Sequence, residues 1–132
     1  MTKKQGFTLI ELMLVVIIIA ALGAMVLPRL TGRAEQARIA VAKTDVISNI
    51  ASALDLYELD NGRYPSASQG LEALLTKPSG TTINWNGPYI KKVPLDPWGN
   101  LYQYSYPGSA GKDYDLSSLG PNGVEGDDDI SN

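Results

Sequence analysis

The residues best suited to chemistry lie near the end of the chain, where four acids follow one another closely. Glu125, Asp127, Asp128 and Asp129 share a glycine-rich segment with Asn122, and the segment has no sulfur or imidazole group. Carboxylate, amide and carbonyl oxygens suit a hard cation, which takes roughly six to eight of them. The ligand spacing of an EF-hand is absent. The segment therefore indicates a cation-binding loop of another kind, and the alternative is a disordered, solvated run of acids.

The composition of the chain excludes many catalytic mechanisms. The chain contains neither cysteine nor histidine, which excludes disulfides, thiol nucleophiles, Cys/His zinc sites and mechanisms that use a histidine base. Paired acids hydrolyse glycosides in some enzymes. Here the acids other than Glu11 lie mostly on a predicted helix or in the terminal segment, where solvated charge is usual. The residues alone therefore give little support to an enzyme.

The charge distribution argues against a nucleic-acid partner. The chain has 11 basic and 14 acidic residues, a net charge of -3, and residues 113–132 carry acids but no base. A nucleic-acid surface needs clustered basic side chains. The row of Tyr102, Tyr104 and Tyr106 has only Lys112 near it in the sequence. We therefore expect these tyrosines to pack in a core rather than to stack on bases.

One apolar segment dominates the first part of the chain. Residues 9–27 carry a single charge, Glu11, and a helix of that length covers roughly 28 Å, close to the hydrocarbon thickness of a membrane. A secretory signal peptide has a shorter apolar region. A plain membrane anchor has no need of an acid, which is costly inside a membrane. Both are therefore weaker alternatives.

The start of the chain accounts for that acid. A short leader containing Lys3 and Lys4 ends at Gly6, and Phe7 and Glu11 follow before the long apolar run. This order resembles the prepilin signal shared by type IV pilins and type II secretion pseudopilins. The resemblance implies that a membrane-bound prepilin peptidase cleaves between Gly6 and Phe7 and methylates the new amine of Phe7.

Glu11 gains a physical role if that cleavage occurs. A lone carboxylate in hydrocarbon costs several kcal/mol unless it is paired, and cleavage creates a positive amine on Phe7. We expect Glu11 to pair with such an amine, of its own or of a neighbouring subunit. That pairing would set the register of assembly.

Helical periodicity continues beyond the apolar run. We expect one long helix from about Phe7 to Asp60, kinked near Pro28 because proline removes a helical hydrogen bond. The sequence Asp60-Asn61-Gly62 supplies a stop signal. The second half of the helix carries an apolar stripe at steps of three or four residues, which we expect to be core. The stripe consists of Ile39, Ala42, Val46, Ile50, Ala53 and Tyr57.

Short elements and turns fill the rest of the chain. Ser66 and Gln69 form a capping-box pattern before a short helix over residues 71–75. Alternation predicts two antiparallel strands, over residues 101–106 and 113–119. The predicted fold is therefore α+β, with the long helix packed on a small antiparallel sheet.

Motifs along nearly the whole chain narrow the resemblance. The motifs are Tyr64-Pro65, residues 69–74, residues 96–100 and Ser118-Leu119-Gly120 before an acidic end. Together they resemble the motifs of the major pseudopilins of type II secretion. The resemblance implies a type IV pilin-like fold. It also implies three parts: a cleaved leader (1–6), a transmembrane and assembly helix (7–29) and a periplasmic domain (30–132).

That resemblance implies a structural function and no catalysis. Single-pass subunits in the inner membrane would polymerise through the hydrophobic helix into a periplasmic pseudopilus, which drives export of folded proteins through the outer membrane. The implied partners are copies of the same chain, minor pseudopilins, the inner-membrane assembly platform, the prepilin peptidase and the exported proteins. Two alternatives stay open: a type IV pilin in adhesion or motility, and a membrane-tethered periplasmic enzyme or binding domain. Charge counting leaves the orientation undecided, because basic residues flank both ends of the apolar run.

The resemblance also assigns the acidic segment. It implies a calcium ion bound by the carbonyls of Leu119 and Val124 and by side chains of Asn122, Asp127, Asp128 and Asp129. Many family members have aspartate at the position of Asn122 and a longer insertion before the final acids. Which two of the three aspartates bind the ion stays open.

Overall fold

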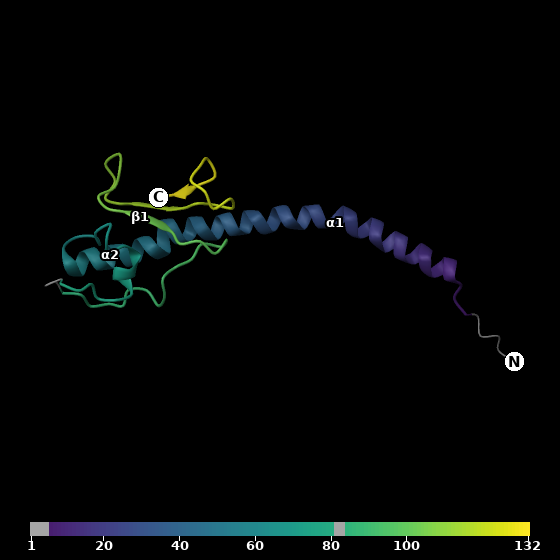
Figure 1. Ribbon diagram of the computed structural model, residues 1–132, viewed down its shortest axis with the longest axis horizontal. Coiled ribbons are helices and arrows are strands. Elements are labelled where there is room, and N and C mark those ends of the chain that lie inside the picture. Colours follow the sequence, from purple (N-terminus) through teal and green to yellow (C-terminus); the bar gives the residue numbers. More distant parts are fainter. Residues whose placement is uncertain (1–5, 81–83) are drawn as a thin grey trace. The chain divides into compact units, whose positions relative to one another are not determined.

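The computed structural model describes residues 6–80 and 84–132 (Figure 1). They form two compact units that divide between Ala37 and Arg38. The helical elements are α1 (Leu9–Thr44), the π-helical turn η1 (Asp45–Asn49), α2 (Ile50–Asn61) and the 3-10 turn η2 (Leu71–Leu74). The strands are β1 (Gln103–Ser105), β2 (Asp115–Ser118) and β3 (Ile130–Ser131).

The predicted long helix is confirmed. Helices α1 and α2, joined by η1, form one helical stretch from Leu9 to Asn61, and Pro28 lies inside α1 without ending it. The stretch ends at the predicted stop. Gly62 adopts the left-handed conformation, with φ of 73°, and its N–H donates to the carbonyl oxygen of Glu58 at 2.7 Å.

In the first unit, the apolar side chains of α1 are exposed. Ile10 and Met25, near the two ends of the apolar run, are 75% and 74% exposed. Among the described residues, one helix is long and apolar enough to cross a membrane, and the apolar run forms its first part. Apolar surface of this extent must be covered by lipid or by other protein.

The second unit has a core of its own, between the helix and the sheet. The apolar stripe is buried as predicted except at its first member, Ile39, which is half-buried. Val46, Ile50 and Tyr57 are at most 2% exposed. These side chains belong to one cluster with Leu74 of η2 and Leu116 of β2, both fully buried. The α+β fold is therefore confirmed.

The sheet is antiparallel, in the order β1-β2-β3. Tyr104 of β1 stands opposite Leu116 of β2, and both predicted strands are present in shorter form, with three and four residues. Tyr102, just before β1, is 5% exposed, and Tyr104 packs against the same core. The tyrosine row is thus part of the core, as expected.

Strand β3 differs from the prediction, which treated the end of the chain as a loop. Ile130 pairs with Ser118 of β2 and is 7% exposed. A two-residue strand is too short to show the alternation by which strands are predicted. Because β3 pairs with β2, both ends of the acidic segment are attached to the sheet.

The π turn η1 is a second difference. The Asp45 carboxylate accepts a hydrogen bond from the Tyr102 hydroxyl at 2.9 Å and another from the Asn49 amide at 2.6 Å. A π turn contains one residue more than an α turn. Because apolar residues still recur every four positions across it, the sequence pattern does not distinguish it from regular helix.

The capping box is confirmed, but the helix after it is only the 3-10 turn η2. The Ser66 N–H donates to Gln69 Oε1 at 3.0 Å, and the Gln69 N–H donates to Ser66 Oγ at 3.3 Å. Leu71 and Leu74 of η2 are buried. The turn therefore anchors the segment that follows the long helix to the core.

Candidate functional site

A buried carboxylate, Asp96, organises the turn that precedes β1. Its side chain is almost fully buried, at 4% exposed. One oxygen, Oδ1, accepts the backbone N–H groups of Trp98 and Asn100 at 3.1 and 2.8 Å. These bonds hold residues 96–100 as a tight turn. In the sequence, residues 96–100 stand out only as a motif of the resemblance, and nothing there gives Asp96 a role.

Ser118 connects that turn to the acidic segment. Its hydroxyl donates to Asp96 Oδ2 at 2.7 Å and accepts the backbone N–H of Gly120 at 3.1 Å. Ser118 is fully buried. The start of the segment is therefore fixed in position by a buried polar chain, a property that the sequence did not reveal.

Within the acidic segment, here called the C-terminal loop (residues 119–129), two side chains are joined. Asn122 donates through Nδ2 to Asp128 Oδ1 at 2.7 Å, and its Oδ1 accepts the backbone N–H of Val124 at 2.7 Å. The loop is a series of turns between β2 and β3. The loop therefore has a defined conformation and is not a free acidic tail.

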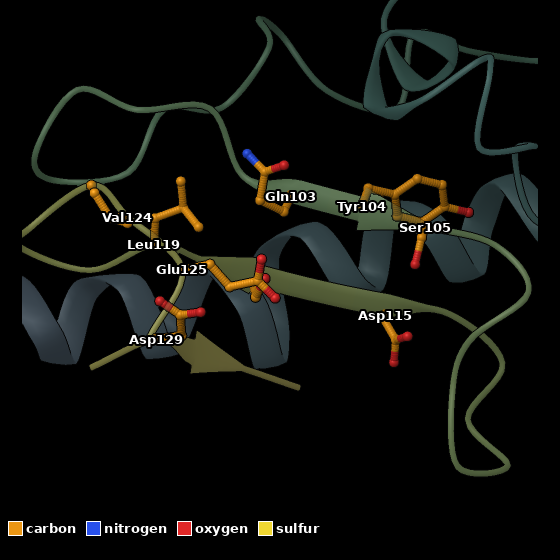
Figure 2. A pocket seen from close by; sticks show the side chains of 10 residues that line it. Gln103, Tyr104, Ser105, Asp115, Leu119, Val124, Glu125 and Asp129 are labelled. Atoms are coloured by element: carbon orange, nitrogen blue, oxygen red, sulfur yellow. The ribbon is translucent and has the colours of Figure 1, made fainter. Parts of the chain in front are cut away.

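Asp129 has a different environment. It is partly buried, and its Oδ1 is a buried oxygen without a hydrogen-bond partner in the described parts of the chain. The residue lines a hollow of about 490 Å³ between the sheet and the C-terminal loop. Figure 2 shows Asp129 and Glu125 at this hollow, with Gln103 and Asp115 contributed by β1 and β2.

That unpartnered oxygen is the structural test of whether a cation fits the loop. A buried carboxylate oxygen without a partner is costly, because it has lost its water. A hard cation would satisfy it, and the carbonyl-bearing residues Leu119 and Val124 line the same hollow. Asp129 is thus the predicted ligand at which the structure leaves an oxygen for a cation.

The six predicted ligands are not all gathered at one point. Asn122 and Asp128 are bonded to each other, while Asp127 is exposed. Among residues 6–80 and 84–132, no three acidic side chains converge as a metal-binding group. The structure therefore brings Leu119, Val124 and Asp129 to one hollow and leaves Asp127 outside it.

The N-terminal candidates lie at the start of α1. Gly6 and Phe7 are exposed, Phe7 by 81%. Glu11 is in the first turn, where its Oε2 accepts the Thr8 N–H at 3.3 Å and its own N–H donates to Thr8 Oγ1 at 3.3 Å. This is a capping box, and the Thr-x-x-Glu spacing could have revealed it.

Two family models match the chain. The family described as "Type II secretion system (T2SS), protein G" matches residues 29–132, and the "Prokaryotic N-terminal methylation motif" matches residues 1–27. Together they account for nearly the whole sequence.

Known proteins give the same result. A type II secretion system core protein G from Pseudomonas aeruginosa is 54% identical over 130 residues, which cover 96% of this chain and 90% of the relative. The core protein G of Vibrio cholerae is 48% identical over 128 residues, covering 96% and 86%. The crystal structure of the major pseudopilin from the type 2 secretion system of enterohaemorrhagic Escherichia coli superposes with a TM-score of 0.67 at 41% identity, covering 78% of this chain and 88% of that one.

Proposed function

Because the chain belongs to the type II secretion system protein G family, we propose that it is the major structural subunit of a type II secretion pseudopilus. It polymerises through α1 into a periplasmic filament that drives export of folded proteins through the outer membrane. It is a structural protein and has no catalytic role.

The observation that carries this proposal is the exposed apolar surface along α1. In the inner membrane, lipid covers this surface. In a filament, neighbouring copies of α1 cover it instead, so the apolar side chains stay out of water during the transfer from membrane to filament. No covalent link between subunits is needed.

The match over residues 29–132 favours secretion over the alternative of a type IV pilin in adhesion or motility. The N-terminal methylation motif does not separate these two functions, because both classes of protein have it. On this proposal the globular unit lies in the periplasm. Its partners are minor pseudopilins, the inner-membrane assembly platform and the exported proteins.

The leader is the proposed substrate of the prepilin peptidase. Cleavage between Gly6 and Phe7, followed by methylation of the Phe7 amine, agrees with the match of the methylation motif to residues 1–27. Gly6 is exposed and open, with no atom near the position that a Cβ would take. The junction is therefore accessible in the isolated chain.

Glu11 has two competing roles. It caps α1 through Thr8, and on our proposal it pairs with the new amine of Phe7 after cleavage, in its own or a neighbouring subunit. The first role needs only a hydrogen-bonding oxygen, whereas the second needs a negative charge. Variants that separate oxygen from charge therefore distinguish them.

The experiment compares filament yield from cells that produce the full chain or its variants. Glu11→Gln keeps an oxygen for the cap but removes the charge, and Thr8→Val removes half of the cap but keeps the charge. We expect Glu11→Gln and Glu11→Ala to be cleaved normally and to give few filaments, while Thr8→Val assembles. Normal filaments from Glu11→Gln would contradict charge pairing, and defects in Thr8→Val and Glu11→Ala but not in Glu11→Gln would assign Glu11 to capping.

We propose calcium as the ligand of the C-terminal loop. Asp129 Oδ1, which has no partner among the described residues, supports it, with the Leu119 and Val124 carbonyls as further proposed oxygen donors. Asp127 lies outside the hollow and belongs to the proposed set only if the loop rearranges. Asn122 and Asp128 belong to the proposed set only if their mutual bond opens. Bound calcium would offset part of the negative charge of the loop and hold it on the sheet.

A further inference from the structure

Both polar atoms of the Asn122 side chain make hydrogen bonds within the loop. Its oxygen accepts the Val124 N–H, and its amino group donates to Asp128 Oδ1, each at 2.7 Å. The second bond spans six residues and joins the two halves of the C-terminal loop. It is charge-assisted, a class that is shorter and stronger than neutral hydrogen bonds.

We propose that the Asn122–Asp128 pair is a clasp that closes the C-terminal loop without a cation. An amide can do this because it carries a donor and an acceptor on one planar group. A carboxylate at position 122 would accept the Val124 N–H equally well. It would then present a second negative oxygen to Asp128, and the two carboxylates would repel each other unless a cation or a proton lay between them.

The packing around Asp128 gives the clasp a fixed point. Asp128 lies against Gly120, whose Cβ position would be 2.6 Å from the Asp128 carbonyl oxygen and 3.1 Å from its Oδ2. Gly120 is in turn held by the Ser118 hydroxyl. Asn122 therefore closes the loop onto a segment that is already attached to the buried Asp96.

The clasp also changes the role of any bound cation. The clasp engages one oxygen of Asp128 and the side-chain oxygen of Asn122. It does not involve Asp129 Oδ1, which is buried without a partner in the described part of the chain. A cation would thus bind to a loop that is already ordered. This inference goes beyond the proposed function, because closure by the clasp does not depend on filament assembly.

The test uses the full chain in detergent micelles, in excess EGTA, and measures cleavage after Glu125 by a glutamate-specific protease. Glu125 is exposed within the loop and is unchanged in every variant. Asn122→Asp breaks the clasp. Asp128→Asn keeps an acceptor for Asn122, and the double variant Asn122→Asp/Asp128→Asn reverses donor and acceptor while keeping the net charge of the natural chain.

We expect the natural chain and Asp128→Asn to be cut slowly in EGTA and Asn122→Asp to be cut roughly tenfold faster, the size of effect that one charge-assisted hydrogen bond typically has on an opening equilibrium. The double variant should return toward the slow rate. Calcium should protect Asn122→Asp far more than it protects the natural chain. Hydrogen exchange of α2 reports in each sample whether the rest of the fold is intact.

Three results would overturn the clasp. The first is rapid cleavage of the natural chain in EGTA that calcium abolishes, since a cation rather than the clasp would then close the loop. The second is cleavage of Asn122→Asp at the natural rate, and the third is a double variant as labile as Asn122→Asp. None of these results bears on filament assembly, so the proposed function is tested separately.

Discussion

The hydroxyl of Ser118 donates to the carboxylate of Asp96 at 2.7 Å in the interior of the globular unit. The two residues are 22 positions apart, one in the turn before β1 and the other at the end of β2. Their bond joins the turn to the start of the C-terminal loop. Because both are almost fully buried, neither can turn to water if the other is removed.

The first prediction follows from that bond. Asp96→Ala removes an acceptor of three hydrogen bonds and leaves the Ser118 hydroxyl and two backbone N–H groups without it. We expect the free energy of unfolding to fall by about 3 kcal/mol, since each unsatisfied buried group costs about 1–3 kcal/mol. Urea unfolding of the full chain in micelles measures it. The matched control is Asp113→Ala, which removes an exposed acid. Its free energy of unfolding should lie within about 0.5 kcal/mol of that of the natural chain. Equal losses of stability in the two variants would contradict the role of Asp96.

Gly120 gives the second prediction. Its φ is 67°, and a Cβ there would lie 2.6 Å from the carbonyl oxygen of Asp128, so Gly120→Ala strains the backbone and forces the loop open. We expect a loss of about 2 kcal/mol of stability and faster amide exchange in residues 119–129. Gly126→Ala is the control from the same loop, because its nearest contact would be an ordinary 3.6 Å. A Gly120→Ala chain as stable as Gly126→Ala would show that the loop does not pack as described.

The third prediction concerns high pH. Burial, followed by a hydrogen bond to Asp55, raises the pKa of Tyr64 from 10.0 to about 12, and burial is also the main reason that the pKa of Tyr102 is raised. Burial likewise raises the pKa of Tyr57, Tyr89, Tyr104 and Tyr114. The unfolded chain loses these protons near its ordinary pKa and the folded chain only at higher pH. The contribution to stability is therefore complete below pH 10 and is lost as the pH rises through the folded pKa values.

Absorbance of tyrosinate measures this difference. The native chain should ionise later than the chain in urea, and stability should decline from about pH 10 to 12. Tyr102→Phe should make the decline shallower, because one raised group is gone. Coincident titration of native and unfolded chains would contradict the burial of the tyrosine row.

Calcium supplies the fourth prediction. If the ion binds only the folded chain, it should raise stability by about 2.7 kcal/mol when its free concentration is about 100 times the dissociation constant. Asp129→Asn should abolish the rise because it removes the charge of the unpartnered carboxylate, whereas Asp113→Asn should keep it. Thermal unfolding of the full chain in micelles, with calcium or with EGTA, gives the comparison. An unfolding temperature of the natural chain that is the same in calcium and in EGTA would contradict calcium binding.

Sequence patterns predicted those parts of the fold in which many residues repeat one signal. The helical stripe is buried from Ala42 to Tyr57, where the same apolar spacing recurs. Gly62 ends the helix because few residues other than glycine adopt a positive φ at low cost. The π turn escaped prediction because its extra residue leaves the apolar spacing nearly unchanged. Strand β3 escaped because its two residues show no period.

The candidate site was predicted by residue type but not by arrangement. Oxygen-rich composition pointed to the C-terminal loop, and one carboxylate oxygen of the loop, Asp129 Oδ1, has no hydrogen-bond partner among the described residues. Composition cannot tell that Asn122 bonds Asp128, or that Asp96 reaches Ser118, because both bonds depend on how distant turns pack. The capping box of Thr8 and Glu11 could have been predicted, because the Thr-x-x-Glu spacing is a recognised capping signal.

The most direct test of the account is the intact mass of the subunits in filaments sheared from secreting cells. The account predicts a chain that begins at Phe7 with one methyl group on its amine. It also predicts that Gly6→Val, which adds bulk at the junction, leaves an uncleaved chain in the membrane fraction. A filament subunit that retains Met1, a subunit that begins near Ala21, or the absence of this chain from the filaments would contradict it.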